Sequence, residues 1–261
     1  MRVLITGTNG YIGKSLRKAL REKYYVVGLN RSIVDLTDAV AVRDFFNTTH
    51  FFDVVIHCAV EGGNRLVEDS WDVMDKNLMM YYNLLANQTR FGKLIHFGSG
   101  AETYMPSKPY GYSKKIIAKS ILNQDNFYNI KLFGVFDENE LDTRFIKANI
   151  KRYIAKEPMQ VYRNRLMDFF YMQDLIKVVE YYIDTKEPLK EFDCVYDTYF
   201  TLTNIAETLI NSLGNYKVDV KLQEVGADMY ISRYREPLPI SFVGLEEGIK
   251  NVYNKLKNET N

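Results

Sequence analysis

The sequence Gly7-Thr8-Asn9-Gly10-Tyr11-Ile12-Gly13 decides the fold of this chain. It follows the apolar run 2–6, which predicts a buried strand, and leads into apolar residues at helical spacing (Ile12, Leu16, Ala19, Leu20). Glycines let the backbone turn tightly between strand and helix and approach a pyrophosphate, which the first N–H groups of the helix bind. A glycine triplet alone is a weak signal, but in this context it predicts a dinucleotide site that includes Gly7, Asn9, Gly10, Tyr11, Ile12 and Gly13.

The first half of the chain alternates short apolar runs with longer amphipathic stretches. We predict strands at 25–29, 54–58, 93–97 and 130–133, and helices near 40–46, over 65–88 and over 110–122. Strands and helices in alternation predict an α/β fold. The expected form is a Rossmann doubly wound parallel sheet whose strands end at the edge where ligands bind.

The second half is less regular. We predict helices at 144–155, 174–184, 202–213 and 246–257, and short strands at 160–162 and 169–171. We therefore expect an NAD(P)-binding Rossmann core over residues 1–135 and a mixed region over 136–261. That region is expected to complete the sheet and to form a small C-terminal substrate-binding cap.

The composition of the 261 residues is that of an ordinary globular protein, with 46% hydrophobic and 26% charged residues. The net charge of +1 gives no reason to expect a nucleic-acid or membrane partner. Cys58 and Cys194 lie far apart and form no CxxC pattern, so we expect neither a disulfide framework nor a metal site. Without a secretory signal or an apolar run of roughly 18 residues, the expected compartment is the cytoplasm.

The end of the second predicted strand, Leu29-Asn30-Arg31-Ser32, bears on the choice of cofactor. NAD-binding Rossmann domains usually place an acidic residue there to hold the ribose hydroxyls, whereas an arginine suits the 2′-phosphate of NADP. Asn30 and Arg31 therefore predict NADP, with NAD as the alternative if Arg31 is only a solvated loop residue. Asp35 and Leu36 follow, where a turn would contact the adenine.

The motif Tyr110-Gly111-Tyr112-Ser113-Lys114 predicts the catalytic pair. Positions i and i+4 share one face of a helix, so the Tyr110 phenol and the Lys114 ammonium project side by side. A free tyrosine titrates near pH 10 and is a poor acid–base catalyst at neutral pH, whereas a nearby ammonium favours the phenolate. Lys114 can also hold the nicotinamide ribose. A chance YxxxK on an exposed helix is the alternative interpretation.

These motifs resemble those of the extended short-chain dehydrogenase/reductases, the NAD-dependent epimerase/dehydratase family that acts on nucleotide sugars. Further matches spread over nearly the whole chain, at Asp35-Leu36, His57-Cys58-Ala59, Asn77, Ser99, 168–174 and 244–249. The resemblance implies that Tyr110 protonates a carbonyl oxygen, that Lys114 tunes Tyr110 and that Ser99 hydrogen-bonds the same oxygen. It also implies a catalytic role for Asn77 and cofactor contacts at Cys58, Ala59 and Val60.

Within the family, the segments 30–38, 42–46 and 59–63 are most similar to the GDP-fucose synthase-like branch of 4-keto-sugar reductases, which uses NADPH. That branch also epimerises its substrate, with a cysteine after the serine and a later histidine. Here Ala101 or Glu102 stands at the cysteine position and no histidine follows His96, so simple reduction is favoured. The predicted function is NADP-dependent reduction of a nucleotide-linked 4-keto sugar. The resemblance also implies a homodimer, paired through the helix bearing Tyr110 and the helix before it.

Departures from the family pattern leave alternatives open. Counting back from Tyr104 puts Gly100 in the hydroxyl position, and we favour Ser99 because it has a hydroxyl. About ten residues separate Ser99 from Tyr110, roughly half the usual number, so the identity of the sugar does not carry over. Met167 stands where the family usually has an arginine.

Other polar residues are weaker candidates. Glu102 stands where the 4,6-dehydratases of the family carry a catalytic glutamate, but Ala101 replaces the aspartate before it, so Glu102 is kept as a substrate-binding candidate. His57 and His96 are interpreted as core or rim residues rather than catalytic ones. Guanidinium groups match phosphate oxygens, so the candidates for binding the substrate diphosphate, with surface arginine as the alternative, are Arg163, Arg165, Arg233 and Arg235.

Two other functions compete with the reductase. One is a nucleotide-sugar 4-epimerase or dehydratase that keeps NAD tightly bound. The other, from a different class, is a non-catalytic module that senses NADP.

Overall fold

The computed structural model describes residues 1–64, 67–214 and 216–260, and its contacts divide the chain into two units. Unit 1 comprises Met1–Lys131 and Val179–Phe192, and unit 2 comprises Leu132–Val178 and Asp193–Asn261. The sequence predicts a first region that ends at residue 135 and a later region that completes the sheet. In the structure the first boundary between the units lies between residues 131 and 132, and the later segment 179–192 belongs to unit 1 again.

Within the described residues of unit 1, six strands form one sheet in the order β2-β1-β3-β4-β5-β9. Strand β1 pairs in parallel with β2 and β3, and β3 pairs in parallel with β4, which confirms the predicted Rossmann-like α/β fold. Almost every residue of β4 is buried, as expected of a strand covered on both faces. The strands are β1 (Arg2–Thr6), β2 (Tyr25–Leu29), β3 (Phe52–His57), β4 (Phe91–Ser99), β5 (Phe127–Leu132) and β9 (Glu191–Cys194).

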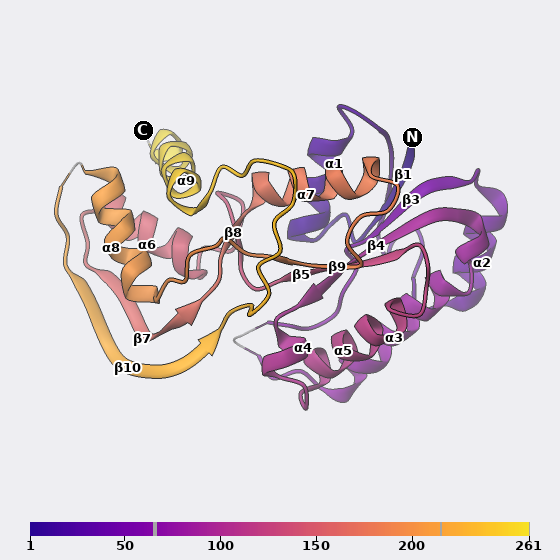
Figure 1. Ribbon diagram of the computed structural model, residues 1–261, viewed down its shortest axis with the longest axis horizontal. Coiled ribbons are helices and arrows are strands. Elements are labelled where there is room, and N and C mark those ends of the chain that lie inside the picture. The colour runs from indigo at the N-terminus through magenta and orange to yellow at the C-terminus, as the bar shows by residue number, and fades with distance from the viewer. Residues whose placement is uncertain (65–66, 215, 261) are drawn as a thin grey trace. The chain divides into compact units, whose positions relative to one another are not determined.

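Helices cover both faces of this sheet (Figure 1). The helices α3 and α5 pack against each other on one face, and α1 lies on the other. The helix predicted over 65–88 begins only at Trp71, with Ser70 as its N-cap, and part of the predicted range lies outside the described residues. The elements are α1 (Tyr11–Leu20), α2 (Ala39–Thr48), α3 (Trp71–Leu85), the 3₁₀ turn η1 (Gln88–Arg90), α4 (Ala101–Tyr104) and α5 (Pro109–Ile121).

Unit 2 contains helices and two parallel strand pairs, the long pair of β7 with β10 and the short pair of β6 with β8. The sequence predicts only part of β7 and misses β10, whose described side chains at 221–225 are all exposed and lack an alternating apolar pattern. The elements are β6 (Val135–Phe136), α6 (Phe145–Ile154), β7 (Met159–Met167), β8 (Phe170–Tyr171), α7 (Met172–Asp184, which crosses into unit 1), α8 (Leu202–Leu213), β10 (Val220–Tyr230) and α9 (Leu245–Thr260).

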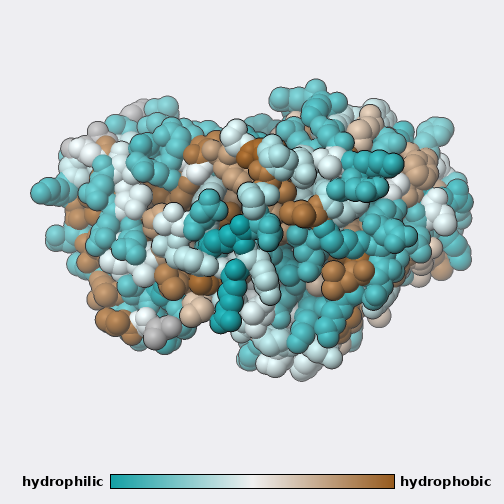
Figure 2. Space-filling model, viewed as in Figure 1, coloured by the Kyte–Doolittle hydropathy of each residue, from teal (hydrophilic) through white to brown (hydrophobic). Residues whose placement is uncertain are grey.

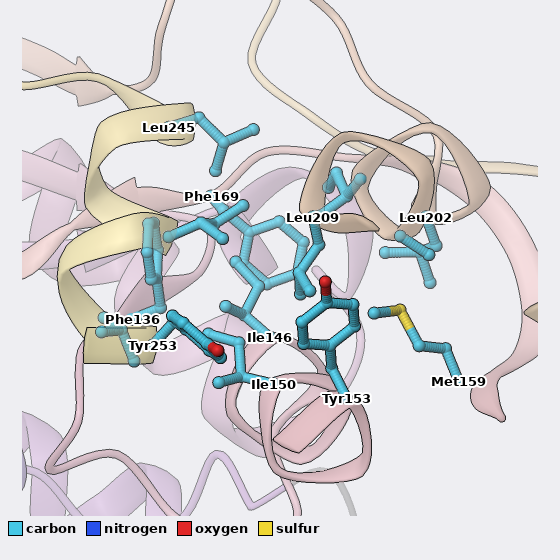
Figure 3. Packing of buried hydrophobic residues seen from close by; sticks show 14 of the residues in the cluster. Phe136, Ile146, Ile150, Tyr153, Met159, Phe169, Leu202, Leu209, Leu245 and Tyr253 are labelled. Carbon is cyan, nitrogen blue, oxygen red and sulfur yellow. The ribbon is translucent and has the colours of Figure 1, made fainter. Parts of the chain in front are cut away.

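The core of unit 2 joins α6, α8 and α9 (Figure 3). Ile146, Ile150 and Tyr153 of α6 lie beside Leu209 of α8 and Tyr253 of α9 in this cluster. The ring centroids of Tyr153 and Tyr253 lie 5.8 Å apart in an edge-on arrangement. This packing gives unit 2 a hydrophobic core of its own.

Two buried carboxylates hold the loops of unit 2. Asp168 accepts hydrogen bonds from the backbone N–H of Ser232 at 2.7 Å and from the Arg235 guanidinium at 2.9 and 3.0 Å. Asp174 accepts from the backbone N–H groups of Val243 at 2.7 Å and Gly244 at 3.0 Å, just before α9. These contacts explain why acidic residues recur in the stretch 168–174.

Hydrophilic side chains cover most of the face shown in Figure 2, where apolar residues form small separate groups. Among the described residues, no helix is both long enough and apolar enough to cross a membrane.

Candidate active site

The glycine turn between β1 and α1 is closely packed. Gly7 has a φ of +67°, and a Cβ atom on it would lie 2.6 Å from the backbone nitrogen of Ala59. A Cβ on Gly13 would lie 2.4 Å from the carbonyl oxygen of Gly7. Only glycine fits both positions. Gly10, the N-cap of α1, supplies no side-chain cap, so the start of the helix is open to a ligand phosphate.

A pocket of about 260 Å³ lies beside this turn at the carboxyl ends of β1, β2 and β3. Leu29, Val34, Leu36 and Met80 give it apolar walls. Most of the predicted cofactor residues line it: Gly7, Asn9, Gly10, Asn30, Arg31, Asp35, Leu36, Cys58, Ala59 and Val60. A glycine cradle joined to a pocket with apolar walls and a polar rim fits the diphosphate and adenosine of a dinucleotide.

Four predicted cofactor residues are not among those that line the pocket. Tyr11, Ile12 and Gly13 belong to the first turn of α1, and Gly13 packs against the Gly7 backbone. Lys114 lies on α5. Their contact with a cofactor remains a prediction.

The rim of the pocket carries an ion pair that the sequence did not reveal. Arg31, after β2, pairs with Glu61, after β3, and the pair holds the pKa of Arg31 above its ordinary value. The carboxylate of Asp35 accepts from the backbone N–H of Thr37 at 2.9 Å and from its hydroxyl at 2.8 Å, and these bonds lower the pKa of Asp35. The side chain of Asp35 is thus held in a local turn, whereas that of Glu61 meets Arg31.

Asn77 of α3 is buried, and its side chain meets the loop after β3. Its Oδ1 accepts from the N–H of Glu61 at 2.9 Å, and its Nδ2 donates to the carbonyl of Glu61 at 3.1 Å. Nδ2 also lies 3.3 Å from the hydroxyl of Ser113, which in turn donates to the carbonyl of Tyr110 at 2.7 Å. Asn77 therefore links the rim of the pocket to the helix that carries Tyr110.

The predicted catalytic pair lies on α5, which begins at Pro109. Lys114 is 4% exposed, and burial lowers its pKa to about 8. Its Nζ donates to the carbonyl of Phe97 at 2.6 Å and lies 5.8 Å from the centroid of the Tyr110 ring. The Tyr110 ring packs on Gly63, where a Cβ would come within 2.9 Å of it. Helix geometry and two close contacts thus fix the phenol beside the ammonium.

Two buried histidines, His57 and His96, lie close to Lys114. The rings of His57 and His96 are 5.4 Å apart, and the Nε2 of His96 lies 3.5 Å from the Nζ of Lys114. Burial lowers the pKa of both, that of His57 to about 3, so both rings are neutral at physiological pH. The structure places both in the core, as predicted, and adds a contact between His96 and Lys114.

Ser99 and Glu102 meet at the end of β4. The backbone N–H of Ser99 donates to Oε1 of Glu102 at 2.9 Å, and the hydroxyl of Ser99 accepts from the N–H of Ala101 at 3.2 Å. Glu102 is buried, which raises its pKa to about 7, and its carboxylate lies 3.7 Å from the Nζ of Lys131. The described contacts of Glu102 are with the protein itself, so its substrate-binding role remains a prediction.

The family model for the NAD dependent epimerase/dehydratase family matches residues 3–194 of the chain. The chain belongs to this family. The match covers the glycine turn, the pocket and the Tyr110/Lys114 pair, and it confirms the predicted family and an NAD(P)-dependent enzyme.

Three similar proteins are named as enzymes of nucleotide-linked sugars. The chain is 24% identical over 210 residues to CDP-abequose synthase of Yersinia pseudotuberculosis, covering 71% of this chain and 74% of that protein. It resembles the solved structure of the GDP-mannoheptose C4 reductase MlghC of Campylobacter jejuni, with a TM-score of 0.78, 16% identity and 98% of both chains covered. For dTDP-4-dehydrorhamnose reductase of Bacillus anthracis the TM-score is 0.76 at 17% identity, with 97% of this chain and 98% of that chain covered. These structural likenesses show the fold.

The arginines predicted to bind the substrate diphosphate all lie in unit 2. Arg163 and Arg165 both pair with Asp228, at 3.1 and 3.4 Å, and Arg233 is exposed. Arg235 is 12% exposed on its side chain, pairs with Asp168 and stacks on the ring of Tyr199 at 3.8 Å. Its bonds to Asp168 give it a structural role. Among the described residues, no group of three histidine, cysteine or acidic side chains could hold a metal ion.

Proposed function

We propose that this family member is an NADP-dependent reductase of a nucleotide-linked 4-keto sugar. The observation that carries the proposal is the placement of Lys114 beside Tyr110, with its ammonium held at 2.6 Å from the carbonyl of Phe97. The nucleotide pocket, with Arg31 at its rim, belongs to the same unit.

In this mechanism the residues of the chain supply the proton and stabilise the phenolate that its loss leaves behind. A nicotinamide dinucleotide held by the glycine turn would supply a hydride to the carbonyl carbon of the sugar. Tyr110 donates its phenolic proton to the carbonyl oxygen, which completes the reduction to an alcohol. The Lys114 ammonium stabilises the phenolate that remains, and the Ser99 hydroxyl hydrogen-bonds the same substrate oxygen. Arg163, Arg165 and Arg233, all in unit 2, remain the proposed ligands of a diphosphate.

Two of the similar structures are reductases, which supports this proposal. One is named a GDP-mannoheptose C4 reductase, and another is a dTDP-4-dehydrorhamnose reductase solved with NADP. The resemblance of 30–38 and 59–63 to the GDP-fucose synthase-like branch points the same way. Ala101 or Glu102 at the usual cysteine position and the lack of a histidine after His96 argue against epimerisation by that branch's residue pair.

The test is turnover of purified protein with NADPH or NADH and a panel of UDP-, GDP-, dTDP- and CDP-linked 4-keto sugars. We expect NADPH to be consumed in proportion to reduced product. Tightly bound NAD in the purified protein, with no net consumption of NADPH, would instead indicate the epimerase or dehydratase. Binding of NADPH without turnover of any sugar would favour the non-catalytic sensor.

We also propose that the protein is a homodimer that pairs through α3 and α5. Large apolar side chains are exposed on both helices: Trp71, Met79 and Tyr82 on α3 and Tyr112 on α5. The rings of Trp71 and Tyr112 meet edge-on at 6.3 Å, so the exposed groups of the two helices are continuous. Light scattering should give twice the chain mass for the native protein and a lower mass for Trp71→Glu. A monomeric native protein would rule this dimer out.

A further inference from the structure

The ion pair between Arg31 and Glu61 spans the rim of the nucleotide pocket. Arg31 follows β2 and Glu61 follows β3, and both line the pocket beside Asn30 and Val60. The Arg31 side chain is 61% exposed and that of Glu61 is 31% exposed. The guanidinium that the sequence predicts for a 2′-phosphate is therefore already paired with a carboxylate.

The position of Glu61 is fixed by its backbone. Asn77 binds both the N–H and the carbonyl of Glu61, at 2.9 and 3.1 Å. Two glycines with φ of +72° and +73° follow, and the N–H of Gly63 donates to the carboxylate of Asp69 at 3.1 and 3.2 Å. With its backbone held on both sides, Glu61 keeps its place at the rim, and its carboxylate pairs there with Arg31.

The two carboxylates of the pocket differ in what they face. Asp35 is bound by Thr37, whereas Glu61 meets Arg31 directly. Lys76, on α3, also interacts electrostatically with Arg31 and Glu61, and the charge of Asp35 acts on Arg31 as well. A phosphate that binds Arg31 must displace the Glu61 carboxylate or lie next to it, and two like charges at such short range repel each other.

We propose that Glu61 sets the cofactor choice of this enzyme: its carboxylate competes with the 2′-phosphate of NADPH for Arg31 and so reduces the preference for NADPH over NADH. The inference rests on the proposed function, in which Arg31 receives that phosphate. It predicts that neutralising Glu61 strengthens binding of 2′-phosphorylated nucleotides alone. The native enzyme, with Glu61 in place, is then expected to use NADPH and NADH more evenly than Arg31 alone would predict.

The experiment is calorimetric titration of the full-length protein with adenosine 2′,5′-bisphosphate and with 5′-AMP, which differ only in the 2′-phosphate. The variants are Glu61→Gln, Arg31→Gln and the double variant. Glu68→Gln is the matched control because it removes the same charge from an exposed ion pair, with Lys108, outside the pocket lining. Glu61→Gln keeps the size of the side chain, and exposed ion pairs add little stability, so its melting temperature should match that of the native protein.

Glu61→Gln should tighten the bisphosphate by roughly ten-fold, the size expected of one charge at short range that is mostly screened by solvent. Binding of 5′-AMP should be unchanged, Glu68→Gln should change neither nucleotide, and the gain should vanish in the Arg31→Gln background. An equal change for both nucleotides, no change, or a gain that persists without Arg31 would overturn the inference.

A different result would contradict the proposal that NADP is the cofactor. If the native protein binds both nucleotides equally and Arg31→Gln weakens neither, Arg31 does not receive a 2′-phosphate. That result would overturn both the NADP assignment and the role of Glu61.

Discussion

Asn77 binds the backbone of Glu61 through both ends of its side-chain amide, at 2.9 Å and 3.1 Å. The same amide nitrogen lies 3.3 Å from the Ser113 hydroxyl, on α5, the helix that carries Tyr110. The rim of the nucleotide pocket and α5 are thus linked by one buried side chain. Replacing Asn77 should therefore disturb nucleotide binding as well as catalysis.

Asn77→Ala leaves the N–H and carbonyl of Glu61 without their partners. A half-buried backbone group that loses its hydrogen bond costs about 1–3 kcal/mol, so we expect a loss of stability in this range. The dissociation constant of 5′-AMP, which lacks the 2′-phosphate that Glu61 would oppose, should also rise, because Ala59, Val60 and Glu61 line the pocket. Urea unfolding and calorimetric titration measure the two effects. Asn123→Ala, which removes an exposed asparagine of the same unit, is the control.

Tyr110→Phe removes the proton donor and keeps the ring that packs on Gly63. Loss of a general acid typically slows turnover about 10²- to 10⁴-fold, and we expect kcat to fall in that range. Binding of NADPH should not change, because the phenol is not part of the pocket lining. Tyr25→Phe, at an exposed tyrosine of the same unit outside the pocket lining, is the control. A Tyr110→Phe variant with native kcat would refute the mechanism.

Gly63→Ala tests whether the loop after β3 positions the Tyr110 ring. A Cβ at Gly63 would lie 2.9 Å from that ring, and its φ of +73° disfavours any side chain. Gly244→Ala is the control, since Gly244 has a φ of +87° but no atom within 4 Å of the added Cβ. Both variants should lose about 1 kcal/mol to backbone strain. Only Gly63→Ala should lower kcat, and equal kcat values for the two would argue against the contact.

Glu102→Gln should change how stability depends on pH. Burial raises the pKa of Glu102 from 4.5 to about 7, so the folded protein keeps a proton that the unfolded chain loses above pH 4.5. That contribution is fully present below about pH 4.5 and is lost as the pH rises through 7. The difference in unfolding free energy, variant minus native, should therefore grow across this window, by on the order of 3 kcal/mol, and then level off. Parallel stability curves in urea at pH 4.5 to 8 would contradict the expectation.

Much of the candidate site could be predicted from the sequence because its residues lie close together in the chain. The residues 7–13 must be glycine-rich wherever a strand turns directly into a helix against a phosphate. Tyr110 and Lys114 share a helix face by the geometry of the α-helix alone. Glu61 escaped detection because it meets Arg31 across two strands, thirty residues apart. The contact of His96 with Lys114 gave no signal either, because a buried histidine next to a lysine has the same local sequence as any core histidine.

The sequence by itself determined the alternation of strands and helices in unit 1, the glycine turn and the placement of Tyr110 and Lys114 on one helix face, since each arises from residues close together in the chain. Only the tertiary structure decided that Glu191–Cys194 joins the main sheet and that Val220–Tyr230 pairs with Met159–Met167. The physical reason is that a strand gains its stability from a partner remote in sequence. Short or polar segments such as these carry little pattern of their own until that partner is in place.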